Sequence, residues 1–78
     1  MKLRFTVTEI TRRANVTGNG DLLRVCLCPT PKAKENKGVF DGEFFGGSIY
    51  LETLLAPKAK EMKVGRDIMV EFSEAKED

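Results

Sequence analysis

A strict alternation of polar and apolar side chains near the amino terminus restricts the fold of this chain more than any other feature. Leu3, Phe5 and Val7 occupy every second position, and polar residues separate and flank them: Lys2, Arg4, Thr6 and Thr8. Successive side chains of a β-strand point to opposite faces of a sheet. The pattern therefore predicts a half-buried strand over residues 2–12 and argues against an apolar signal peptide.

The same strand is predicted to contain a β-bulge. Ile10 falls on the polar side if the alternation continues unchanged, and one extra residue near Glu9 returns it to the apolar side. Because a bulge increases the local bend of a strand, we expect the sheet to curl.

A hairpin and a second strand are predicted next. Residues 17–21, Thr-Gly-Asn-Gly-Asp, contain Asn-Gly, which favours a hairpin because both residues tolerate positive φ. Residues 22–28 alternate again, and Pro29 and Pro31 end the strand because proline cannot donate to a sheet ladder. The phase predicts two sets of side chains: Leu23, Val25 and Leu27 inward, and Arg24, Cys26 and Cys28 outward.

The polar segment from residue 30 to 38 is interpreted as a solvated, mobile loop. Its three lysines, Lys32, Lys34 and Lys37, have no helical spacing. The alternative interpretation is a flexible arm that contacts phosphate.

Three further strands are predicted over residues 39–45, 48–53 and 67–73. In the second of these, Ile49 and Leu51 face inward. The last strand is predicted to place Ile68, Val70 and Phe72 inward and Met69 and Glu71 outward. One short helix is predicted at about residues 57–62, since Pro57 suits a first helical turn and Ala59 and Met62 then share a face.

These elements together predict one small, mostly-β domain. A chain of 78 residues is one domain with a modest core. Five strands and one short helix favour a five-stranded barrel of the OB type, or a strongly bent antiparallel sheet, over residues 1–78, with a frayed tail at 73–78. An open sheet covered by one helix is the alternative architecture.

Composition narrows the class of protein further. Hydrophobic residues make up 41% and charged residues 32% of the chain, which is too apolar for a disordered chain and too polar for a membrane protein. We expect a cytoplasmic protein. Residues 1–38 hold eight Lys/Arg against three acids, and residues 39–78 hold five against nine. The folded chain either has a basic and an acidic face or interleaves the two halves.

The chemical inventory argues against an enzyme. The chain has no histidine, the commonest general acid–base, and no glycine-rich phosphate loop. Its two serines, Ser48 and Ser73, do not lie in a nucleophile-elbow sequence. Cys26 and Cys28 are expected to be ordinary reduced thiols, because a zinc site usually needs four ligands. No cofactor, metal or catalytic residue is predicted.

The carboxy-terminal 30 residues or so resemble small uncharacterised OB-fold-like proteins encoded by tailed bacteriophages. The resemblance consists of Gly46-Gly47-Ser48-Ile49-Tyr50-Leu51, then Ala56-Pro57-Lys58-Ala59, then the strand that follows Gly65. Arg66 and Asp67 stand where that group more often has a Lys-Glu pair, and Met69 stands where aromatics are frequent. The resemblance implies a small barrel of phage origin, located in the host cytoplasm, and assigns no functional residue.

The preferred hypothesis is a non-enzymatic module that binds single-stranded nucleic acid. Such proteins combine a cationic groove with aromatic rings on which bases stack. Arg4 and Arg24 both face outward in the predicted strands and are candidate cross-strand neighbours. The candidate cations are Arg4, Arg12, Arg13, Arg24, Lys32, Lys34 and Lys37, and the candidate stacking rings are Phe40, Phe44, Phe45 and Tyr50.

The alternative hypothesis is a protein-binding or self-associating module, for example a phage accessory or structural protein. Small open sheets have free edges that pair with another strand, and oligomerisation relieves a small core. The outward thiols, Tyr50 and Met69 would then form an apolar patch. A contiguous basic groove supports the first hypothesis, whereas a mixed surface with an apolar strip or a free edge supports the second.

Overall fold

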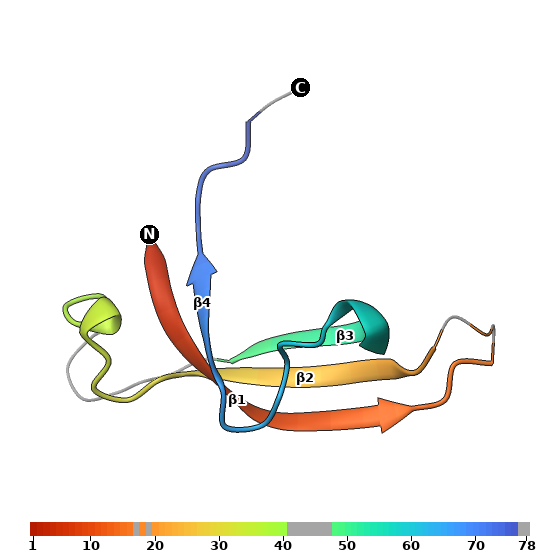
Figure 1. Ribbon diagram of the computed structural model, residues 1–78. Coiled ribbons are helices and arrows are strands. Elements are labelled where there is room, and N and C mark those ends of the chain that lie inside the picture. Colours follow the sequence, from red (N-terminus) through yellow and green to blue (C-terminus); the bar gives the residue numbers. More distant parts are fainter. Residues whose placement is uncertain (17, 19, 41–47, 77–78) are drawn as a thin grey trace.

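The computed structural model describes residues 1–16, 18, 20–40 and 48–76, and these form one curled antiparallel sheet (Figure 1). Four strands lie within them: β1 (Lys2–Arg13), β2 (Leu22–Pro29), β3 (Ile49–Leu55) and β4 (Asp67–Glu71). The strand order is β3-β2-β1-β4. The prediction of a mostly-β, strongly bent antiparallel sheet is confirmed.

The predicted number of strands was too high for the described part of the chain. Val39 and Phe40, which open the strand predicted at residues 39–45, lie in a turn and a bend. Residues 41–45 of that prediction lie outside the described residues. The sheet is therefore an open, four-stranded half-barrel as far as it is described.

The helix predicted at residues 57–62 was also wrong. The chain makes a single 3-10 turn, η2 (Ala56–Lys58), and then leaves helical geometry at Ala59, where φ is −119° and ψ is 46°. A helix of one or two turns is not stable without packing along a whole face. Ala59 is buried and Met62 is half-buried against the core, so the two predicted contacts form without a helix.

The bulge predicted near Glu9 is confirmed and explains how the sheet bends. Val7 lies opposite Leu27 and Glu9 lies opposite Cys26, so Thr8 is the extra residue of β1. Residues before the bulge pair with β4, and residues from Phe5 onward pair with β2. Ile10 returns to the inner face and packs against the core.

The hairpin between β1 and β2 has a longer connection than a two-residue turn. Arg13 pairs with Leu22, so residues 14–21 connect the strands. Asn19 lies outside the described residues, and Gly20 has a φ of +85°. A Cβ atom on Gly20 would lie 2.9 Å from Cγ of Pro57. Glycine is therefore required both for the backbone conformation and for the approach of η2.

The core lies on the concave face of the sheet. The predicted inward residues of β1 and β2 are all buried, and Val7 and Val25 have no exposed surface. Side chains from β3, β4 and the segment after η2 complete the cluster at its margins: Ile49, Leu51, Leu54, Met62, Ile68 and Val70.

Two predicted orientations need correction. Cys26 faces the outer side, as predicted, but is only 8% exposed, since Glu9 on β1 and Tyr50 on β3 flank it. Phe72 was predicted inward, but β4 ends at Glu71 and the ring is 43% exposed. The concave face ends before Phe72, so the ring has no core to enter.

A second bulge lies in β3 and is strained. Leu23 pairs with Leu54 and Val25 pairs with Leu51, so Glu52 and Thr53 together face the single residue Arg24. Thr53 has a φ of 58°. A β-branched residue with positive φ is a true outlier, because its branched side chain crowds the backbone.

Thr53→Gly is expected to raise the free energy of unfolding by about 0.5–1 kcal/mol, because glycine adopts positive φ without that crowding. Urea denaturation followed by circular dichroism would measure the change. Thr11→Gly is the matched control, because Thr11 is exposed in regular β1 and glycine there should destabilise by up to about 1 kcal/mol. A loss of stability in both variants would contradict the strain at Thr53.

Within the part of the chain that the structure describes, no helix has the length and apolar character needed to cross a membrane.

Candidate functional site

Three of the four candidate arginines are engaged in ion pairs. Arg4 contacts Glu35 at 3.0 Å and Asp67 at 3.5 Å. Arg12 Nη1 lies 3.1 Å from Asp21 Oδ2, and Arg24 Nε lies 3.1 Å from Glu52 Oε1. The Asp67 and Glu52 pairs join the basic amino-terminal half to the acidic carboxy-terminal half. The fold therefore interleaves the two halves at these points rather than separating them.

Arg4 and Arg24 are not cross-strand neighbours. The register places Met69 opposite Arg4, and Thr11 opposite Arg24. Arg12 lies opposite the buried Leu23, so its Cβ points to the other face of the sheet from that of Arg24. A single groove of arginines is therefore absent from the described sheet.

The three candidate lysines, by contrast, are brought together. Lys32, Lys34 and Lys37 line an open hollow of about 470 Å³. Phe40 forms part of its wall and also packs against the core. The remaining lining comes from Ala33, Asn36 and Gly38. We call this feature the lysine hollow. Its lining combines three exposed lysine residues with one aromatic residue.

Asn36 fixes the loop that carries the lysine hollow. It is 2% exposed, and it lies in a short 3-10 turn, η1 (Lys34–Asn36). Its Oδ1 accepts a hydrogen bond from the Arg4 N–H at 2.8 Å, and its Nδ2 donates to the carbonyl oxygens of Arg4 at 2.8 Å and Thr30 at 3.1 Å. The side chain of Asn36 thus satisfies main-chain groups of Arg4 in place of a neighbouring strand. β2 has ended at this point, and Pro31 has no N–H to donate.

Arg4 holds the same loop through its side chain. Its Nε donates to both carboxylate oxygens of Glu35 at 3.0 Å. This hydrogen bond, with the charge of Arg4, lowers the pKa of Glu35. Glu35 lies between Lys34 and Asn36 in η1. Arg4 was predicted to bind a ligand, and in the structure its side chain also anchors this loop.

The backbone of the loop makes a tight turn at its start. The N–H of Ala33 approaches the Thr30 carbonyl oxygen at 3.5 Å, and Lys32 between them has a φ of 60°. Proline followed by a residue with positive φ is typical of a type II turn. The turn and η1 together give the described part of this loop regular hydrogen-bonded geometry.

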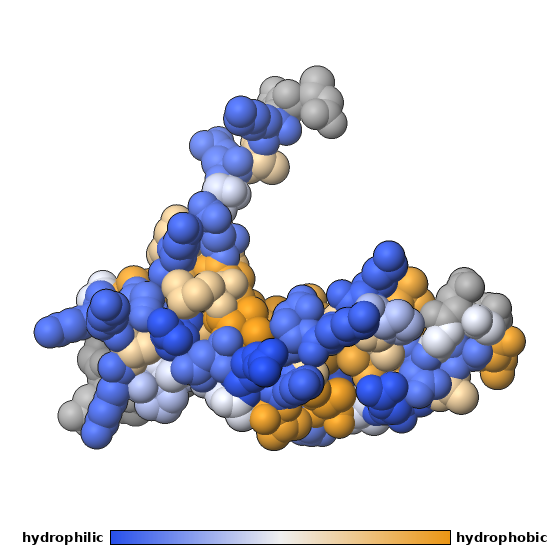
Figure 2. Space-filling view, viewed as in Figure 1, coloured by the Kyte–Doolittle hydropathy of each residue, from blue (hydrophilic) through white to orange (hydrophobic). Residues whose placement is uncertain are grey.

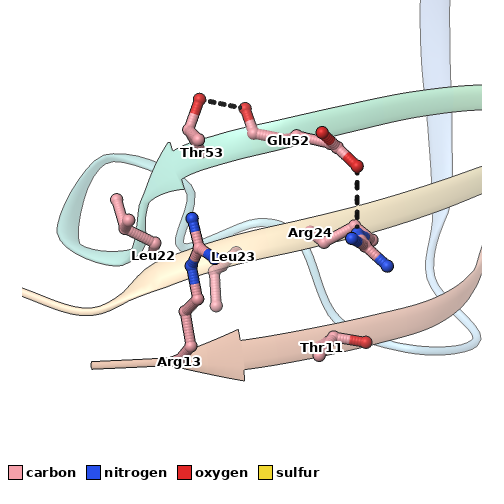
Figure 3. A pocket seen from close by; sticks show the side chains of 7 residues that line it. All are labelled: Thr11, Arg13, Leu22, Leu23, Arg24, Glu52 and Thr53. Carbon is pink, nitrogen blue, oxygen red and sulfur yellow. Dashed lines mark hydrogen bonds and ion pairs between the residues drawn. The ribbon is translucent and has the colours of Figure 1, made fainter. Parts of the chain in front are cut away.

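Arg13 belongs to a second, smaller hollow on the outer face of the sheet, of about 170 Å³ (Figure 3). Figure 3 shows its side chain beside Leu22 and Leu23, while Arg24 points to Glu52. Thr53 also lines this hollow. The hollow mixes one acid with two arginines, so it offers less positive charge than the lysine hollow.

Tyr50 is the exposed aromatic ring of the outer face, with 65% of its surface accessible. It lies opposite Cys26. A hydrogen bond with Cys26 and the nearby negative charge of Glu9 raise the pKa of the phenol. Glu9, Thr11 and Arg24 line a shallow hollow beside the ring.

The two thiols are free and lie in polar surroundings. Cys28 Sγ lies 3.5 Å from Ser48 Oγ and 3.6 Å from Thr8 Oγ1. These hydrogen bonds lower the pKa of Cys28. No group of three or more Cys, Asp or Glu side chains with the geometry of a metal site occurs among the described residues.

Two residue roles were missed by the sequence analysis, and two candidates lie outside the structure. Asn36 and Glu35 looked like ordinary loop residues, and no local pattern marks their contacts with Arg4, which lies 32 positions from Asn36 and 31 from Glu35. Phe44 and Phe45 are not among the described residues.

Comparison with known proteins assigns no class to this fold and site. No family model matches the chain, and no curated protein or solved structure is significantly similar to it. The resemblance to phage proteins therefore stays a prediction.

Proposed function

We propose that the protein is a non-enzymatic module that binds single-stranded nucleic acid, with the lysine hollow as its phosphate-binding site. The observation that carries the proposal is the convergence of Lys32, Lys34 and Lys37 around one open hollow. Three ammonium groups attract consecutive phosphates without reading sequence, because lysine acts as a flexible point charge.

The ion pairs on the sheet support the choice of the lysines over the arginines. Arg4, Arg12 and Arg24 each have an acidic partner within 4 Å, so a phosphate would have to compete with a carboxylate. No ion pair is found for Lys32, Lys34 or Lys37 among the described residues. Within the described ranges, these lysines therefore differ from the three arginines, whose charges are paired at contact distance.

Tyr50 is the candidate stacking surface of the proposal. Its ring is the exposed aromatic of the outer face, with 65% of its surface accessible, and bases stack on such rings without regard to sequence.

The test is a titration of a fluorescent single-stranded oligonucleotide at several salt concentrations. Lys32→Glu, Lys34→Glu and Lys37→Glu combined are expected to weaken binding by at least about tenfold. They should also reduce the slope of log K against log salt by about 2, given about 0.7 per phosphate contact. Tyr50→Ala should weaken binding less, and with little change in that slope.

The matched control reverses three exposed lysines elsewhere. Lys58→Glu, Lys60→Glu and Lys63→Glu combined change the net charge by the same amount but leave the hollow intact. Equal losses in the two triple variants would show general charge attraction and refute a site at the hollow. Absence of binding by the unchanged protein at low salt would refute the function itself.

A further inference from the structure

The surface of the chain is too large for a compact monomer of its mass. The accessible area is 6172 Å² for 8.7 kDa, whereas a compact monomer of that mass exposes about 4,700 Å². The radius of gyration is 14.6 Å, against about 11.5 Å expected for 78 residues. Part of this excess of about 1,500 Å² belongs to the segment after β4, which runs away from the sheet (Figure 1), and the remainder is to be compared with the roughly 800 Å² that each partner buries in a standard interface.

The edge of the sheet at β4 carries the charged residues Asp67 and Glu71 but has no bulge. Edge strands are normally blunted by a bulge or by charges along the edge. The other edge strand, β3, has its bulge at Thr53, whereas β4 pairs with β1 in unbroken register from Asp67 to Glu71. Figure 1 shows β4 at the margin of the sheet, with the following residues running away from it.

Exposed apolar side chains gather around this edge. Met69 is 46% exposed on the outer face, and Phe72 is 43% and Met1 63% exposed at the end of the strand. Ile68 and Val70 complete the inner side of β4 and are only partly buried. Figure 2 shows apolar surface where β4 leaves the body of the molecule.

The free hydrogen-bonding groups of the edge can be assigned from the pairing with β1. Met1 and Phe72 exchange N–H to carbonyl bonds in both directions. Hydrogen-bonded residues alternate along an antiparallel pair. Val70 and Ile68 therefore bond to β1, and the main chain of Asp67, Met69 and Glu71 faces the free edge.

Charge selects one register in which this edge can pair with itself. Antiparallel pairing centred on Met69 places Asp67 opposite Glu71 of the second copy, and like charges directly opposite destabilise a pair. Pairing centred on Val70 places Met69 opposite Glu71, Ile68 opposite Phe72 and Arg66 opposite Glu74. This register places Ile68 opposite the exposed apolar side chain of Phe72 and brings opposite charges together at its ends.

We propose that β4 is a dimerisation edge, which pairs antiparallel with β4 of a second copy of this chain around a two-fold axis at Val70. An interface on a two-fold axis must be complementary to itself, and the Val70-centred register has that property. The paired sheets then extend across both copies and cover the exposed apolar side chains at the edge.

Sedimentation equilibrium with the Met69→Pro variant tests the edge. The N–H of Met69 faces the free edge, so proline there removes a bond to the second copy but none to β1. The unchanged protein should reach twice 8.7 kDa at high micromolar concentration. The variant should dissociate at least tenfold more readily, with an unchanged circular dichroism spectrum. The proposal would be overturned if the unchanged protein stayed monomeric at every concentration up to 1 mM. That result would mean a free energy of dimerisation weaker than about −4 kcal/mol.

Disulfide cross-linking tests the register independently of stability. In a background with Cys26→Ala and Cys28→Ser, Val70→Cys should form a covalent dimer on mild oxidation, because the two residues at the axis lie directly opposite. Ile68→Cys is the matched control and should not cross-link, since it lies opposite Phe72. Cross-linking at position 68 but not at 70, or at neither, would refute this register.

Discussion

Phe5→Ala is expected to lower the free energy of unfolding by about 3–5 kcal/mol, the largest effect of any single substitution considered for this chain. Phe5 is 5% exposed, and it is paired on both sides, with Pro29 of β2 and with Ile68 of β4. Removing the ring leaves a cavity where the sheet changes partners. Neither neighbouring strand can collapse into it without disturbing the other.

This loss is large compared with the total stability of such a domain. A chain of 78 residues is expected to unfold with about 4–12 kcal/mol. Urea denaturation should therefore show Phe5→Ala partly or wholly unfolded in dilute buffer. Val64→Ala is the control, since Val64 is 64% exposed and should change stability by no more than about 0.5 kcal/mol. A loss below 1 kcal/mol for Phe5→Ala would contradict the position of this ring in the core.

Asn36→Ala is expected to cost about 2–4 kcal/mol, although the substitution removes a polar residue from a loop. Asn36 makes three hydrogen bonds to the main chain of Arg4 and Thr30. Alanine leaves the Arg4 N–H without its partner in a partly buried site, and an unmade buried hydrogen bond costs about 1–3 kcal/mol. Thermal melting should show a decrease of roughly 8–32 °C, given about 4–8 °C per kcal/mol.

Two comparisons separate the contribution of the Asn36 hydrogen bonds from other effects. Asn36→Asp keeps an acceptor for the Arg4 N–H but cannot donate to the two carbonyl oxygens, and it adds a charge beside Glu35. It should therefore also destabilise the fold. Lys37→Ala, at the adjacent exposed position, should leave the melting temperature nearly unchanged. A stable Asn36→Ala variant would mean that this side chain does not anchor the loop.

The same substitution links stability to the proposed function. Asn36 lies in the wall of the lysine hollow, and its hydrogen bonds hold the loop against Arg4. If the lysines bind phosphate as a fixed group, loosening the loop spreads them over many arrangements, and ordering them again on binding costs free energy.

Much of the sheet could be predicted because its signals are local. Alternation along β1 and β2 identified the buried side chains of the inner face correctly, though not the burial of Cys26 on the outer face, and the misplaced phase of Ile10 located the bulge. These features depend only on which face each residue of a strand occupies. The prediction of a helix at residues 57–62 was wrong for a different reason. A few helix-compatible residues cannot nucleate a helix that has almost no face to bury.

The candidate site was predictable only as a set of residue types. The sequence named the lysines of the hollow and the arginines of the sheet as equivalent cations. What distinguishes them is the partner of each charge, and Arg4 finds Glu35 and Asp67 only once the strands are in register. The anchoring role of Asn36 is hidden for the same reason.

The sequence by itself determined the class of fold, the inward and outward faces of its main strands and the bend in β1, because periodicity is a property of neighbouring residues. The tertiary structure alone decided which arginines are ion-paired, that the three lysines line one hollow and which strands form the edges of the described sheet. Those properties arise from contacts between residues far apart in the chain, and such contacts follow from strand register and loop geometry, which no local pattern encodes.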